Sequence, residues 1–108
     1  MKKLYVILSI FIIMVFVSVT TGVSKETDIK GESLFKQNCS PCHPEGGNVI
    51  NPQKTLHKKD REANGVKKAS DIVGKMRNPG QGMTKFDEKT IPDKDAKEIA
   101  EYILKTFK

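Results

Sequence analysis

Cys39-Ser40-Pro41-Cys42-His43 is the most informative stretch of this sequence. Two cysteines three positions apart, followed directly by a histidine, form the attachment pattern of a c-type haem. The two thiols can form thioethers with the vinyl groups of the porphyrin, while the histidine turns its ring onto the iron. The chain has no other cysteine. The pattern therefore predicts one haem c (iron) per chain, bound by Cys39, Cys42 and His43.

Three other interpretations of the cysteine pair are less favourable. A dithiol redox pair is typical of a βαβ unit, and this sequence has no strand pattern of any length. A zinc site needs a second pair of ligands, which His57 alone cannot supply. A structural disulfide would also use both cysteines, but the added histidine makes the haem pattern the more specific one.

The first residues have the shape of a secretory signal peptide. Lys2 and Lys3 precede an apolar run over residues 4–19, and charged sequence follows. Small residues permit cleavage after Gly22 or after Ser24. The sequence therefore predicts export of the chain across a membrane.

This interpretation divides the chain into a signal peptide, residues 1–24, and one monohaem domain, residues 25–108. An uncleaved membrane anchor is the alternative, because the apolar run is only a little shorter than the ~20 residues that a spanning helix prefers. No cysteine stands near the junction to carry a lipid anchor. Because haem is attached to such motifs on the outer side of the bacterial inner membrane, we expect a periplasmic protein.

The charge balance favours protein partners over nucleic acid. The chain has 19 basic and 13 acidic residues, and its formal net charge is +6. Loss of Lys2 and Lys3 with the leader would lower this charge by two, and two haem propionates would lower it further. The remaining lysines are interspersed with acidic residues, which is typical of a solvated surface. A weakly steered contact with the acidic face of a redox protein fits this balance, and we expect a monomer.

The periodicity predicts an all-α domain in which the first and last helices cross. The first helix is expected to begin at Asp28, its N-cap, and to carry the chain through Phe35 into the haem motif. Gly31 lies inside this helix, where a glycine costs about 1 kcal/mol relative to alanine. Close approach of another helix would explain it, and Tyr102 is the expected contact to Gly31 and Phe35.

The last helix is expected to begin at Asp93, its cap, and it has a regular amphipathic pattern. Its apolar stripe consists of Ala96, Ile99, Ala100, Ile103, Leu104 and Phe107. At fewer than about 90 residues a domain core is marginal, and a bound cofactor usually helps to stabilise it.

A third helix is expected from Ser70, its N-cap, to the stop at Asn78-Pro79, with Asp71 in the first turn. Its inward side chains are Ile72, Val73 and Met76. Between the first and third helices, residues 45–68 are expected to form a loop folded over the haem, with a short helix over residues 59–63.

The sixth position of the iron has three candidate ligands. Met83 follows two glycines in a loop, which lets the backbone approach the haem closely, and it belongs to no apolar stripe. Met76 belongs to the stripe of its helix, so core packing is its expected role. His57 stands among lysines and is expected to be exposed. We favour Met83, with a vacant position as a further alternative.

The ligand set determines the expected activity. A thioether ligand and an apolar pocket both favour ferrous iron and raise the reduction potential. With both axial positions filled, no substrate can reach the iron, so we expect a single-electron carrier and not an enzyme. The alternative is a haem-based sensor of small ligands, or a weak peroxidase, with an open sixth position.

Several motifs together resemble one known family. They are Gly31-Glu32-x-x-Phe35 before the haem motif, the loop segments Gly46-Gly47-Asn48-Val49-Ile50, Lys54-Thr55-Leu56 and Glu62-Ala63-Asn64-Gly65, and Gly82-Met83 with Phe86. In these the sequence resembles the class I monohaem cytochromes c, and among them the cytochrome c6 group. The resemblance implies the class I fold, one haem c, electron transfer between redox proteins, and axial ligation by His43 and Met83.

The sequence departs from that family in the methionine loop. A proline usually follows the ligand methionine, but here Thr84 stands in that position and Pro79 precedes the loop. The reduction potential therefore does not carry over. The resemblance also implies that a backbone carbonyl of Asn51-Pro52 accepts a hydrogen bond from His43.

Overall fold

The computed structural model describes residues 23–108, which contain helices and no strand. The elements in chain order are α2 (Val23–Asn38), the 3-10 turn η1 (Pro44–Gly46), α3 (Lys58–Ala63), α4 (Ala69–Arg77) and α5 (Asp93–Thr106). The proposed cleavage sites and the apolar run belong to the predicted leader, residues 1–24, which lies outside the described residues but for its last two. Within residues 23–108, no helix has the length and apolar character needed to cross a bilayer.

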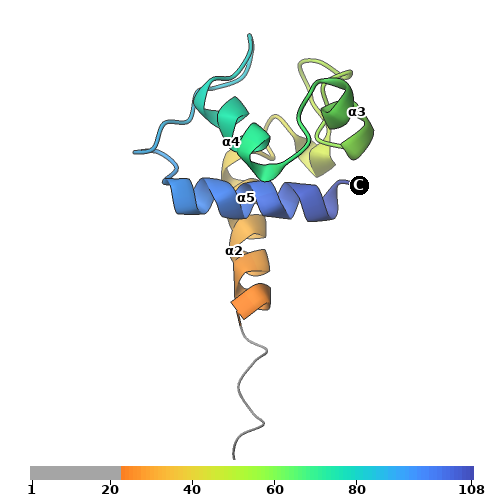
Figure 1. The fold of residues 1–108 in the computed structure, drawn as a ribbon. Coiled ribbons are helices and arrows are strands. Elements are labelled where there is room, and N and C mark those ends of the chain that lie inside the picture. The colour runs from red at the N-terminus through yellow and green to blue at the C-terminus, as the bar shows by residue number, and fades with distance from the viewer. Residues whose placement is uncertain (1–22) are drawn as a thin grey trace, which may run out of the picture.

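The first and last helices cross, as the sequence predicts (Figure 1). At the crossing, a Cβ atom on Gly31 would stand 2.6 Å from the backbone oxygen of Glu98 and 3.0 Å from Cβ of Tyr102. Only a glycine fits there. The rings of Phe35 and Tyr102 lie beside it with their centroids 5.3 Å apart. The predicted all-α fold with crossed terminal helices is therefore confirmed.

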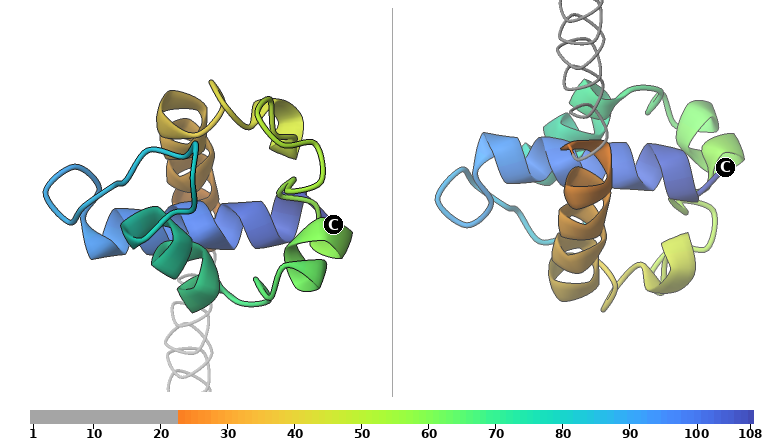
Figure 2. Two further views of the ribbon diagram at one scale, coloured as in Figure 1. Left: turned by 90° about the horizontal axis from the view of Figure 1, so that it is seen from above. Right: turned by 90° about the horizontal axis from the view of Figure 1, so that it is seen from below.

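The core lies where α2 and α4 pack against α5 (Figure 2). Its buried apolar side chains come from all three helices, from Phe107 at the C-cap of α5 and from one loop residue, Ile91, which the periodicity does not mark. They are Phe35, Ile72, Met76, Ile91, Ala96, Ile99, Ala100, Ile103 and Phe107. The predicted stripe of the last helix is thus buried except for Leu104, which is half-buried against the core, and the predicted packing role of Met76 is confirmed.

The expected helix starts are wrong in three places. α2 is already formed at Val23, so Asp28 lies inside it, and its carboxylate accepts a hydrogen bond from Lys105 on α5. Asp93 is the first residue of α5 and follows Pro92, the N-cap. Its carboxylate forms an ion pair with Arg77 at 2.7 Å. Both acids serve contacts between elements, which sequence spacing within one helix does not show.

α4 begins at Ala69, one residue before its expected cap Ser70. The capping acceptor is the Asp71 carboxylate, which takes hydrogen bonds from the backbone N–H groups of Lys67 and Lys68 at 3.0 and 3.1 Å. These bonds lower the pKa of Asp71 below its ordinary value. The predicted end of the helix before Asn78 and the short helix before Asn64 are both confirmed.

The end of the chain packs on the turn that follows the cysteine motif. A Cβ atom on Gly46 would stand 2.5 Å from the ring of Phe107. The Phe107 carbonyl accepts a hydrogen bond from the backbone N–H of Lys58 at 3.1 Å. The C-terminal residues therefore support both ends of the loop between η1 and α3.

Candidate functional site

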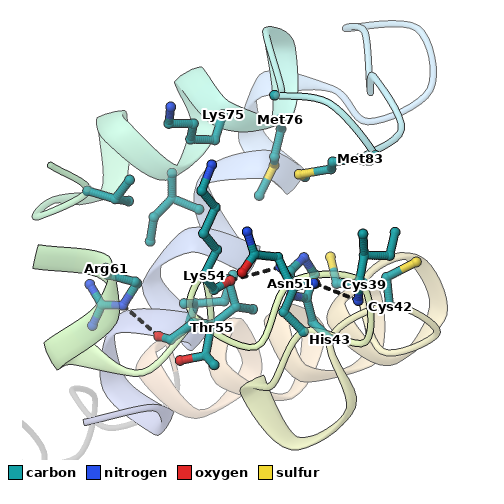
Figure 3. Close-up of a pocket in the computed structure, with 18 of the residues that line it drawn as sticks. Cys39, Cys42, His43, Asn51, Lys54, Thr55, Arg61, Lys75, Met76 and Met83 are labelled. Atoms are coloured by element: carbon teal, nitrogen blue, oxygen red, sulfur yellow. Dashed lines mark hydrogen bonds between the residues drawn. The ribbon is translucent and has the colours of Figure 1, made fainter. Parts of the chain in front are cut away.

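A cavity of about 290 Å³ lies between the turn after α2 and the loop after α4 (Figure 3). Four predicted site residues, Cys39, Cys42, His43 and Met83, all line it. The histidine and the two cysteines lie along one wall, and Met83 lies across from them (Figure 3). The surface of the cavity is mostly apolar, and the rest of its lining comes mainly from the loop between η1 and α3, from α3 and α4, and from the loop between α4 and α5. The fold thus brings together residues that are 40 positions or more apart in the sequence.

The backbone beyond α2 fixes the orientation of His43. The His43 N–H donates to the Cys39 carbonyl at 2.8 Å, so the motif forms one further helical turn. Nδ1 of His43 lies 2.7 Å from the Gly47 carbonyl oxygen. A carbonyl can only accept, so Nδ1 carries the proton and Nε2 keeps its lone pair for a metal. The expected acceptor in Asn51-Pro52 is wrong, because η1 folds the Gly47 carbonyl back toward the ring.

The two cysteines differ in their surroundings. Cys39 is half-buried against the core, whereas Cys42 is exposed, and both are free thiols. Burial raises the pKa of the Cys39 thiol to about 11. Because the thiolate is the reactive form, Cys39 stays protonated and slow to oxidise at neutral pH. In the folded chain, burial therefore makes the Cys39 thiol less reactive than an exposed one.

Two methionines face the cavity from the wall opposite His43 (Figure 3). Met76 is 3% exposed and is fixed in the core by α4. Met83 is half-buried in the loop that follows α4. Gly82 precedes it with a φ of +92°. Residues other than glycine rarely adopt this backbone conformation. The loop can therefore turn sharply just before Met83.

His57 does not line the cavity. It is exposed, as expected, and immediately precedes α3. Its ring lies against that of Phe107, with the centroids 5.7 Å apart. The geometry gives His57 a surface packing role.

Sequence reasoning missed the polar end of the cavity. Arg61, Lys54, Thr55 and Lys75 line it, and Arg61 is only 4% exposed. Arg61 stands in the polar helix α3 between two charged residues, Asp60 and Glu62, so no periodic pattern marks it as buried. Val49 and Ile50, assigned to the loop over the haem, are about three-fifths exposed.

The donor set fits a haem c. Two reduced thiols, one imidazole with Nε2 free, and a thioether on the opposite wall converge on a mostly apolar cavity. Sulfur and imidazole donors of this kind are the axial ligands of low-spin electron-transfer haems.

The comparisons with known proteins agree with this fit. The family model of cytochrome c oxidase, cbb3-type, subunit III, matches residues 26–103. Cytochrome c6 of Cyanidium caldarium is 39% identical over 74 residues, which cover 68% of this chain and 66% of that protein. Cytochrome c6 of Pyropia yezoensis is 33% identical over 103 residues, or 95% of this chain and 92% of that protein.

The solved structures include a similar fold. The outer membrane cytochrome F (OmcF) of Geobacter sulfurreducens superposes with a TM-score of 0.71 and 46% sequence identity. The match covers 72% of this chain and 99% of that one. The crossed helices and the haem-type donor set therefore define a class I monohaem protein.

The chain belongs to the cytochrome c family and is one of its small, c6-like members. Its cofactor is haem c, and its general role is that of a small electron carrier that works with redox partners.

Proposed function

We propose that this protein is an exported, periplasmic single-electron carrier. Cys39 and Cys42 hold the haem covalently, and His43 and Met83 supply the axial ligands. The observation that carries the proposal is the pairing of His43, whose Nε2 is freed by the bond to Gly47, with Met83 on the opposite wall. The leader pattern at the start of the chain supports export.

When bound, the haem supplies reversible one-electron chemistry at its iron. The chain's part is to occupy both axial positions, which keeps substrates away from the metal. The Met83 thioether favours the ferrous state, and the apolar lining from Ile72, Met76 and Ile103 disfavours a net positive charge. Both raise the potential. The protein is then a carrier that exchanges electrons through an exposed edge of the haem, and not an enzyme.

The contact surface for partners surrounds the exposed side of the cavity. Val49 and Ile50 are 61% and 60% exposed, and Cys42 beside them is open to solvent. Lys54 and Lys75 line the same cavity and are exposed. An exposed apolar patch, together with exposed lysines at the other end of the cavity, fits a brief, monomeric encounter with a redox protein that carries an acidic face.

The test is the absorption spectrum of the purified holoprotein in both oxidation states. We expect the weak far-red band of ferric His/Met ligation, and we expect Met83→Ala to abolish it and lower the reduction potential. Met76→Leu is the matched control, since a volume-conserving core swap costs less than about 1.5 kcal/mol and leaves the band in place.

Two results would overturn the ligand assignment. If Met76→Leu removes the band and Met83→Ala keeps it, the other methionine is the ligand. If the unmodified ferrous protein binds carbon monoxide freely, the sixth position is open and the protein is a sensor or a weak peroxidase.

A further inference from the structure

Arg61 is the one charged side chain that is buried in the described part of the chain, at 4% exposure. Its Nε donates to the Leu56 carbonyl at 2.7 Å, and a terminal nitrogen lies 3.4 Å from the Phe107 carbonyl. Both acceptors are neutral. A buried cation is costly unless an opposite charge accompanies it. Arg61 therefore needs an anionic partner that offsets the free-energy cost of burying its charge.

No carboxylate among residues 23–108 forms an ion pair with Arg61. Two acids adjoin Arg61 in the sequence: Asp60 instead accepts a hydrogen bond from the Thr55 hydroxyl at 2.5 Å, and Glu62 is exposed. A guanidinium has five N–H donors, and the two carbonyls use only two of them. The side chain therefore has both unneutralised charge and unused donors.

The unused donors belong to a residue that lines the haem cavity. Figure 3 shows Arg61 at the end of the cavity away from Cys42, on the same side as Lys54. In haem, the two propionates project from the edge of the macrocycle opposite the two vinyl groups. If the vinyl groups bond to Cys39 and Cys42, the propionates project toward Arg61.

We propose that Arg61 is the internal counter-charge of a haem propionate, an inference that rests on the haem attachment proposed above. A guanidinium fork matches the geometry of a carboxylate, while the bonds to Leu56 and Phe107 hold the fork in place. Lys54 and Lys75 line the same end of the cavity but are exposed to solvent, so water screens their charges more strongly than that of Arg61. Because an unneutralised propionate stabilises ferric iron, Arg61 raises the reduction potential.

The experiment compares the holoprotein with Arg61→Gln and Arg61→Lys. Lys59→Gln is the matched control, because Lys59 lies on the same helix, is exposed and does not line the cavity. The measurements are the midpoint potential and the redox-difference infrared spectrum of haem isotope-labelled in its propionate carboxyls. We expect Arg61→Gln to lower the potential and shift the labelled carboxylate bands, while Lys59→Gln changes neither.

Arg61→Lys separates charge from geometry. It keeps a cation but loses the bidentate fork, so the potential should fall less than in Arg61→Gln while the carboxylate bands still shift. If Arg61→Gln does not fold, the band shift in Arg61→Lys decides the matter.

The proposal is overturned if the stability falls in both variants while the potential and the propionate bands stay as in the wild type. Arg61 would then only brace the carbonyls of Leu56 and Phe107. The far-red band of His/Met ligation should persist in every Arg61 variant. Its absence from the unmodified protein would instead contradict the ligand assignment, so the two failures are distinguishable.

Discussion

The side chain of Ile50 lies against Gly82, the residue before Met83. A Cβ atom on Gly82 would stand 3.3 Å from Cγ2 of Ile50, in tight contact, and the φ of Gly82 is +92°. The loop that follows His43 and the loop that carries Met83 therefore meet at this point. Gly82 allows both the sharp turn and the close approach.

Under the proposed axial ligation, Gly82→Ala is expected to weaken the bond between Met83 and the iron. An alanine in the left-handed region costs about 1–2 kcal/mol, and about 1.4 kcal/mol is a factor of ten in an equilibrium. We expect external imidazole to displace Met83 with about tenfold higher apparent affinity. Spectroscopic titration of the ferric holoprotein measures this displacement.

Gly80→Ala is the control for Gly82→Ala, because a Cβ atom on Gly80 meets open space and its φ is not in the left-handed region. Equal imidazole affinities in the two variants would show that the Ile50–Gly82 contact does not restrain Met83.

Gly31→Ala is expected to destabilise the helix crossing. The added methyl group would stand 2.6 Å from the Glu98 carbonyl, a backbone atom that cannot move without shifting α5. Overpacking of this kind costs about 1–3 kcal/mol, which outweighs the helix-propensity gain of up to about 1 kcal/mol. Denaturant unfolding of the holoprotein measures the loss.

Gly74→Ala, in contrast to Gly31→Ala, is expected to stabilise the protein. Gly74 lies within α4, and nothing stands within 4 Å of its would-be Cβ. This variant should gain up to about 1 kcal/mol from propensity alone. A gain in the free energy of unfolding in both Gly31→Ala and Gly74→Ala would mean that the helix crossing has room for a methyl group at Gly31.

Asp71 should contribute to stability in a pH-dependent way. Its folded pKa is lowered by the hydrogen bonds from Lys67 and Lys68. A carboxyl with a depressed folded pKa stabilises the fold above its unfolded pKa of about 3.9. That contribution is lost as the pH falls through the folded pKa. Wild type should therefore exceed Asp71→Asn in stability at neutral pH, and the gap should close below about pH 4.

Glu88→Gln is the control for this measurement, since Glu88 is exposed and makes no interaction among the described residues. Thermal unfolding of the three holoproteins across the acid range gives the comparison. A gap between wild type and Asp71→Asn that is constant with pH would contradict the role of the carboxylate.

Residues whose role follows from local pattern could be predicted from the sequence. Gly31 marks the crossing because a glycine inside a helix requires a packing reason, and the burial of Met76 follows from the period of α4. His57 is exposed, as its lysine neighbours indicate. These signals are local, so tertiary structure did not alter them.

Roles that depend on a partner distant in the chain could not be predicted. Asp28 and Asp93 have the residue type of a cap, but they bind Lys105 and Arg77 on other elements. The acceptor for His43 depends on the fold of η1, which brings the Gly47 carbonyl to Nδ1 of the ring. Arg61 has the pattern of a solvated residue, and only the packing of Leu56 and Phe107 around it reveals its burial.

The crossing at Gly31 joins the start of the domain to its end. Tyr102, which completes the contact, is synthesised about 70 residues after Gly31. A contact of such long sequence separation forms only when nearly the whole chain is available. Until that contact forms, Cys39 therefore lacks the packing that later buries it. The order of synthesis leaves an interval in which haem can be attached to an open motif before the fold closes over it.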